Sequence, residues 1–118
     1  MTIGIIGLGF VGLTTALGFC EKGGHTIIGC DKDAERFNTI QSGKSPFYEP
    51  GIEEALNRHL GGRFCVQSTL DGLADKCDIF FYCVGTPARA DGSADLRILN
   101  AAICETFQSY QARGKGFK

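Results

Sequence analysis

The sequence lacks both a long apolar run and an excess of charge of one sign. No uninterrupted apolar stretch approaches the roughly 18 residues of a membrane-spanning helix, and an apolar strand begins at Thr2 without a basic leader. Lysine and arginine number 12 against 13 aspartates and glutamates. This balance excludes the basic surface that binds nucleic acid or anionic membranes. We therefore expect a cytoplasmic protein with neither nucleic acid nor a membrane as partner.

Metal-ligand spacing is also missing. The two histidines and six cysteines form no CxxC pair, and no His stands at ligand spacing from a Cys, which argues against a zinc site. Several cysteines, such as Cys30 and Cys83, lie inside apolar runs, where a free thiol behaves as a small hydrophobe. We expect no metal, reduced thiols in the core, and the Cys83 side chain pointing into the sheet, although an even count leaves disulfides open.

Apolar runs alternate with amphipathic segments along the chain. The pattern predicts strands over 2–6, 26–30, 64–66 and 78–84, and helices over about 13–22, 34–41, 52–60 and from about 95 past Tyr110. Ser68-Thr69-Leu70-Asp71 looks like a capping box that opens one more short helix. In the final helix, one apolar stripe is predicted: Leu96, Leu99, Ile103, Phe107 and Tyr110.

This alternation predicts an α/β fold, a doubly wound parallel (Rossmann) sheet with strand order 3-2-1-4. A complete fold of this kind adds strands beside the fourth, so we expect one incomplete domain over 1–118, truncated at its C-terminal side. The fourth strand would then be an apolar edge carrying Phe80, Phe81 and Tyr82. We expect self-association through this edge or the final helix.

Gly7-Leu8-Gly9-Phe10-Val11-Gly12 is a GxGxxG motif that follows a predicted strand and opens a predicted helix, with Asp31 ending the next strand. In that context the motif predicts dinucleotide binding. Gly7 permits the tight turn, Gly9 lets the backbone approach a pyrophosphate, and Gly12 lets the helix pack closely on the strand. The helix N-terminus attracts the phosphates. The alternative is three glycines in an ordinary turn.

Asp31 is predicted to set the choice of cofactor. Its carboxylate can accept hydrogen bonds from both hydroxyls of the adenosine ribose, whereas its charge repels a 2′-phosphate, so NAD is favoured over NADP. Lys32 and Arg36 qualify this inference, because a nearby cation can bind a 2′-phosphate. Lys32 on a solvated surface is the alternative, and Arg36 could lie over the adenine or ribose.

Val84-Gly85-Thr86-Pro87 ends the fourth strand at the carboxyl edge of the sheet, where the crevice of a doubly wound fold forms. Gly85 allows close backbone approach, and the Thr86 hydroxyl can reach a ribose or a phosphate on the nicotinamide side. A plain strand-to-loop turn is the alternative. The predicted cofactor-binding residues are Gly7, Gly9, Phe10, Val11, Gly12, Asp31, Arg36, Val84, Gly85, Thr86 and Pro87.

Three motifs carry a family resemblance. The segment 7–13, GLGFVGL, resembles GLGYVGL; 42–51, SGKSPFYEPG, resembles SGKSPIYEPG; and 84–87 with 91–96 resemble VGTP and DGSADL. The chain thus resembles the N-terminal NAD-binding part of the UDP-glucose/GDP-mannose dehydrogenase family, most closely UDP-glucose 6-dehydrogenase. The resemblance implies that Val11, Asp31, Arg36 and Thr86 contact NAD, and that Phe10 lacks the hydroxyl of the family's Tyr.

The family oxidises the C6 alcohol of a nucleotide-sugar to a carboxylate in two NAD-dependent steps, with a Cys, a Lys and an Asp-assisted water. Those motifs lie downstream of this chain, so we assign no catalytic residue and expect no activity of the chain alone. The nucleotide-sugar would bind only in the intact enzyme. The alternative is a stand-alone NAD-binding module or gene fragment with a partner-dependent role. A methyltransferase is a poorer match, because its turn usually lacks a glycine equivalent to Gly12.

Overall fold

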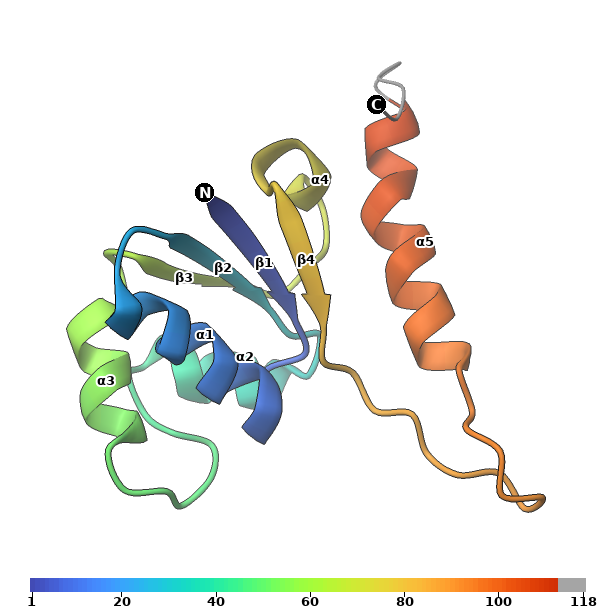
Figure 1. The fold of residues 1–118 in the computed structure, drawn as a ribbon, viewed down its shortest axis with the longest axis horizontal. Coiled ribbons are helices and arrows are strands. Elements are labelled where there is room, and N and C mark those ends of the chain that lie inside the picture. The colour runs from blue at the N-terminus through green and yellow to red at the C-terminus, as the bar shows by residue number, and fades with distance from the viewer. Residues whose placement is uncertain (113–118) are drawn as a thin grey trace.

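Four parallel strands form the centre of the molecule, which a computed structural model describes over residues 1–112 (Figure 1). They are β1 (Thr2–Ile6), β2 (Thr26–Cys30), β3 (Phe64–Gln67) and β4 (Ile79–Tyr82). Their order is β3-β2-β1-β4, and each neighbouring pair is parallel. The predicted doubly wound sheet with order 3-2-1-4 is therefore confirmed.

Helices cover both faces of this sheet (Figure 1). They are α1 (Phe10–Lys22), α2 (Ala34–Gln41), α3 (Ile52–His59), α4 (Leu73–Lys76) and α5 (Arg97–Ala112). The apolar side chains of α1, α2 and α3 share one core cluster, whereas those of α4 and α5 share another. Two separate cores, one on each face, are what an alternating βα chain produces when its crossovers fall on both sides of the sheet.

Side chains of β1 alternate between the two cores. Ile3 and Ile5 pack with Leu13 of α1, and the next residue, Ile6, packs with Leu73 of α4 and Ala102 of α5. This alternation follows from the period of two along a strand. Since both faces of β1 are covered, its short apolar sequence reads as a buried parallel strand.

The predicted capping box over 68–71 is wrong. The short helix α4 begins later, after Gly72, which has a left-handed φ of 78° and no side chain to cap the helix. The backbone at Thr69 is engaged elsewhere, because its carbonyl accepts hydrogen bonds from the Cys30 thiol at 3.1 Å and the Gln67 amide at 2.6 Å. These contacts tie the segment to the ends of β2 and β3.

The final helix uses the predicted stripe only in part. Phe107 packs against Phe80 of β4 and Leu99 is half-buried, but Leu96 and Ile103 are 42% and 38% exposed. Among the described side chains of α5, Ala102 and Thr106 are the buried ones. The Thr106 hydroxyl donates to the Ala102 carbonyl at 2.7 Å, which satisfies a polar group inside an apolar contact. Small residues therefore bring α5 close to α4. The side chain of Tyr110 lies outside the described residues.

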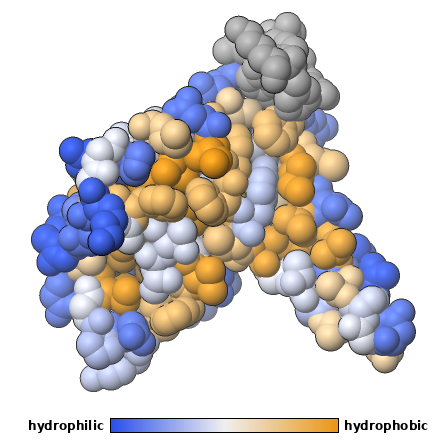
Figure 2. Space-filling model, viewed as in Figure 1, coloured by the Kyte–Doolittle hydropathy of each residue, from blue (hydrophilic) through white to orange (hydrophobic). Residues whose placement is uncertain are grey.

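The fourth strand is shorter than predicted, and its aromatic side chains are engaged. The Phe81 ring lies 5.4 Å from that of Phe19 of α1, and the Phe80 ring lies 5.6 Å from that of Phe107 of α5. The exposed apolar side chain of β4 is Ile79, at 43%. Apolar residues gather beside β4 and along α5 on the face shown in Figure 2.

All six cysteines are free. Cys20 and Cys30 are buried, and burial raises the pKa of their thiols to about 11 and about 12 respectively. Cys77 and Cys83 are half-buried, whereas Cys65 and Cys104 are exposed. The expectation of core thiols is thus confirmed for the first two and wrong for the last two, which lie on outward positions of β3 and α5.

Residues 1–112 contain neither a candidate membrane span nor a candidate metal cluster. None of the helices in this part of the chain has both the length and the apolar character required to cross a membrane. Nor do the described residues bring together three or more His, Cys, Asp or Glu side chains that could bind a metal ion. The cytoplasmic location stays a prediction.

Gly12 has the least room for a side chain of the described glycines, at the point where α1 packs against the end of β1. A Cβ atom added to Gly12 would lie 1.7 Å from the carbonyl oxygen of Gly7, far inside any permitted contact. At Gly7 the φ is +94°, and a Cβ would lie 2.6 Å from the Cys83 carbonyl oxygen. The packing role predicted for Gly12 and the turn predicted at Gly7 are both confirmed.

This contact yields a prediction for stability. Gly12→Ala should lower the free energy of unfolding by about 2–3 kcal/mol, because α1 must move away from β1. Gly18→Ala is the matched control in the same helix: its Cβ would meet nothing within 4 Å, so the change should raise stability by up to about 1 kcal/mol. Urea unfolding measures both. Equal effects of the two variants would contradict the packing argument.

Candidate functional site

The turn between β1 and α1 leaves the start of the helix free of side-chain caps. The Gly7 N–H donates to the Cys30 carbonyl at 2.8 Å, and the Leu8 N–H donates to the Asp31 carboxylate at 2.9 Å. Gly9 is the N-cap residue, and a Cβ there would meet nothing within 4 Å. The first turn of α1 contains no acidic residue. This end of the helix therefore suits an anion.

The carboxylate of Asp31 lies beside that turn and is almost fully buried, with 7% of the residue exposed. Its Oδ2 accepts from Leu8 N–H at 2.9 Å and from Arg36 Nη1 at 3.0 Å, and its Oδ1 accepts from Asp33 N–H at 2.9 Å. Three donors thus compensate a buried charge that would otherwise be very unfavourable. Arg36 is in turn placed by α2, whose N-cap residue Asp33 accepts its backbone N–H at 3.1 Å.

A cavity of about 490 Å³ connects the turn with Asp31. Its volume is within the range of small-molecule sites, which combine apolar walls with a few polar groups. The ends of β1, β2 and β4 form one side, and α5 forms the other. The lining residues are Ile6, Gly7, Gly9, Cys30, Asp31, Lys32, Arg36, Leu70, Cys83, Val84, Gly85, Ile98, Ala101 and Ala102.

Six of the predicted cofactor-binding residues line this cavity, namely Gly7, Gly9, Asp31, Arg36, Val84 and Gly85. Gly12 is buried beneath the turn, and Phe10 and Val11 are 54% and 64% exposed at the first turn of α1. Thr86 and Pro87 are exposed on the loop after β4. The structure thus brings the glycine turn, Asp31 and the end of β4 together, and the contacts of all eleven residues with a cofactor stay predictions.

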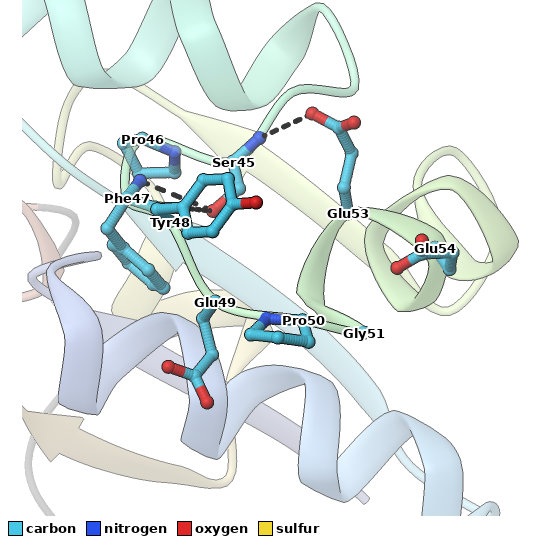
Figure 3. Close-up of a pocket in the computed structure, with 9 residues that line it drawn as sticks. All are labelled: Ser45, Pro46, Phe47, Tyr48, Glu49, Pro50, Gly51, Glu53 and Glu54. Atoms are coloured by element: carbon cyan, nitrogen blue, oxygen red, sulfur yellow. Dashed lines mark hydrogen bonds between the residues drawn. The ribbon is translucent and has the colours of Figure 1, made fainter.

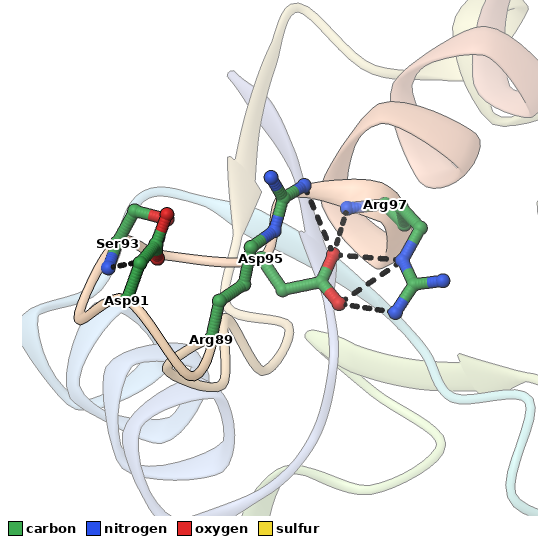
Figure 4. Close-up of polar contacts among 5 residues, drawn as sticks. All are labelled: Arg89, Asp91, Ser93, Asp95 and Arg97. Carbon is green, nitrogen blue, oxygen red and sulfur yellow. Dashed lines mark hydrogen bonds and ion pairs between the residues drawn. The ribbon is translucent and has the colours of Figure 1, made fainter.

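The loop after β4 is held by its own hydrogen bonds (Figure 4). The Asp95 carboxylate accepts from the Arg97 guanidinium at 2.5 Å and lies 3.8 Å from that of Arg89. The pKa of Asp95 lies below its usual range, chiefly because of the Arg97 side chain. Asp95 N–H also donates to the Pro87 carbonyl at 2.8 Å. This network leads the chain away from the sheet before α5 returns (Figure 1).

Sequence reasoning missed the α5 wall of the cavity. Ile98, Ala101 and Ala102 line it, together with Leu70 from the loop before α4. The paired alanines were the available signal, because small side chains allow a helix to lie close to a ligand. Cys83 also lines the cavity, although it packs against the α1 core as well. The expectation that it points into the sheet describes only part of its surroundings.

A second cavity, of about 600 Å³, is formed by the loop before α3 and the start of that helix (Figure 3). Its wall carries Glu49, Glu53 and Glu54 and no cation, so it would repel a phosphate. The Glu53 carboxylate accepts the Ser45 N–H at 3.2 Å. The Phe47 ring lies 5.3 Å from the Phe10 ring, which places this loop against the first turn of α1.

The sequence matches a known family model and known proteins. The model of the UDP-glucose/GDP-mannose dehydrogenase family, NAD binding domain, matches residues 1–114. The UDP-glucose 6-dehydrogenase of Pseudomonas aeruginosa is 42% identical over 98 residues, which are 81% of this chain and 21% of that protein.

Two solved structures resemble the fold closely. A UDP-glucose dehydrogenase from Pyrobaculum islandicum is 37% identical with a TM-score of 0.86, over 96% of this chain and 26% of that one. A GDP-mannose dehydrogenase from Pseudomonas aeruginosa is 32% identical with a TM-score of 0.87, over 98% of this chain and 26% of that one. The chain therefore spans about a quarter of the length of these relatives.

Proposed function

This chain belongs to the UDP-glucose/GDP-mannose dehydrogenase family and NAD is its cofactor, and we propose that NAD binds in the cavity beside Asp31. One observation carries the placement: the uncapped N-terminus of α1 and the buried Asp31 carboxylate open into the same cavity. The first attracts a pyrophosphate, and the second accepts hydrogen bonds from ribose hydroxyls. The acidic cavity offers neither.

In this placement the N–H groups at the start of α1 donate to the pyrophosphate, and Gly9 leaves room for close approach. The exposed Phe10 and Val11 flank the phosphates. Val84 and Gly85 line the nicotinamide end, and Thr86 and Pro87 continue that wall along the loop. The Arg36 guanidinium lies over the adenosine ribose while it remains bound to Asp31. Residues 1–118 thus act as one cofactor-binding domain.

We further propose that the cofactor serves the oxidation of a nucleotide-sugar C6 alcohol to a carboxylate in the intact enzyme. The relatives that support this include a UDP-glucose and a GDP-mannose dehydrogenase, and the motifs of this chain resemble those of the UDP-glucose branch. When bound, NAD supplies the hydride acceptor. The side chains that bind and attack the sugar lie outside this chain, which spans about a quarter of its relatives.

Cofactor choice tests the role of Asp31. NAD should bind at least tenfold more tightly than NADP, because the carboxylate repels a 2′-phosphate. Asp31→Asn retains an oxygen acceptor for the Leu8 N–H but removes the charge, and should reduce this preference about tenfold. Asp33→Asn, which removes the same charge and retains the N-cap acceptor of α2, is the control. Calorimetry measures each dissociation constant. Equal binding of both cofactors, or equal effects of the two variants, would refute the assignment.

An activity assay tests whether this chain alone can catalyse the reaction. The purified chain should produce no NADH from UDP-glucose and NAD, because hydride transfer requires a positioned sugar and the covalent step requires a nucleophile. NADH absorbance reports the reaction. Turnover that survives repurification and disappears in Thr86→Ala would mean that this chain contains a catalytic site.

The edge of β4 yields a proposal of self-association. Within residues 1–112, β4 pairs with β1 and no strand pairs with its other edge, and such edges recruit further strands. The chain should therefore form dimers or larger species as its concentration rises in light scattering. Ile79→Lys, at the exposed side chain of β4, should reduce this association, whereas Ile103→Lys, an equivalent change on α5, should not. A monomer at every concentration would refute the edge argument.

A further inference from the structure

The wall of the cofactor cavity carries two cations beside Asp31. They are Lys32 and Arg36. A cation at this place in a dinucleotide-binding fold can bind a 2′-phosphate, so two cations next to the ribose site would favour NADP unless their charge is already engaged. The partners of these two side chains therefore bear directly on which cofactor is selected.

Each of the two cations has an acidic partner of its own. The Arg36 guanidinium donates to the Asp31 carboxylate at 3.0 Å. The Lys32 ammonium instead forms an ion pair with the Glu105 carboxylate of α5, a residue 73 positions away in the sequence. Glu105 is not part of the cavity wall. It draws the Lys32 ammonium toward α5, away from the cavity.

The ion pair between Lys32 and Glu105 should contribute little to folding stability and more to the choice of cofactor. The side chains of Lys32 and Glu105 are 61% and 43% exposed, and exposed ion pairs contribute only about 0–1 kcal/mol to folding. The removal of Glu105 should therefore leave the fold intact. Its removal should affect the binding of a dianionic phosphate more than it affects folding, because the released Lys32 ammonium can then turn toward the phosphate.

We propose that Glu105 is a specificity-determining residue that prevents Lys32 from binding a 2′-phosphate and so strengthens the preference for NAD over NADP. Two acid–cation pairs then neutralise both cations that could accept the extra phosphate. The acid of the first pair, Asp31, directly follows β2, and that of the second comes from α5. This inference rests on the proposed placement of the adenosine ribose beside Asp31.

The test compares Glu105→Gln with a matched change elsewhere. Glu105→Gln should tighten NADP binding about threefold to tenfold, with NAD binding unchanged within about twofold. Glu21→Gln is the control, because Glu21 pairs with Arg58 and is also 43% exposed, but it lies outside the cavity wall. This control should leave both affinities unchanged. Calorimetry at low and high salt measures them, and the NADP gain should shrink as salt rises.

Two variants of Lys32 separate this role from a general effect of charge. In Glu105→Gln/Lys32→Gln, measured against Lys32→Gln alone, the NADP gain should disappear, because no ammonium remains to be released from Glu105. A gain that persists without Lys32, or one equal to that of Glu21→Gln, would overturn the proposal.

The result also distinguishes this proposal from the placement of the cofactor. If NAD binds to every variant as it does to the wild type and NADP affinity does not respond to Glu105→Gln, only the role of Glu105 fails. If NAD does not bind the chain at all, the cavity is not the cofactor site, and both proposals fall together.

Discussion

The carboxylate of Asp31 accepts hydrogen bonds from the glycine turn, from the start of α2 and from the Arg36 side chain. The first bond joins the end of β2 to the glycine turn, and the other two join it to α2. A lost acceptor would leave the buried Leu8 N–H unpaired, at a cost of about 1–3 kcal/mol. The shape of the turn, the position of Arg36 and the charge of the cavity therefore depend on one side chain.

This arrangement couples the fold to its proposed function. The same carboxylate that positions the turn is available to ribose hydroxyls at the cavity wall, so a substitution there changes stability and cofactor choice together. The close packing of Gly12 on Gly7 supports the same geometry, because it allows the N-terminus of α1 to lie against the end of β1. The helix α5 then completes the cavity with small side chains and, through Glu105, engages the remaining cation.

The sequence predicted the features that depend on local sterics and chain connectivity. Gly7 and Gly12 exclude a side chain because neighbouring backbone atoms lie too close, and strands alternating with helices after a GxGxxG turn are typical of the observed strand order. It could not predict which face of α5 would pack, because an apolar Ile103 and a small Ala102 compete, and the close approach of α4 decides for Ala102. The α5 wall of the cavity was missed for the same reason. The start of α4 was missed because a left-handed glycine, Gly72, precedes it in place of a capping side chain.

The central claim is that the cavity joining the α1 N-terminus to Asp31 is the NAD site. The most direct measurement is a titration of isotope-labelled chain with NAD, followed by the backbone amide signals in two-dimensional NMR. The account predicts that the largest shifts fall on Leu8, Gly9, Asp31 and Ala101, which lie in or beside the cavity wall. Shifts concentrated instead over 45–54, around the acidic cavity, would contradict it.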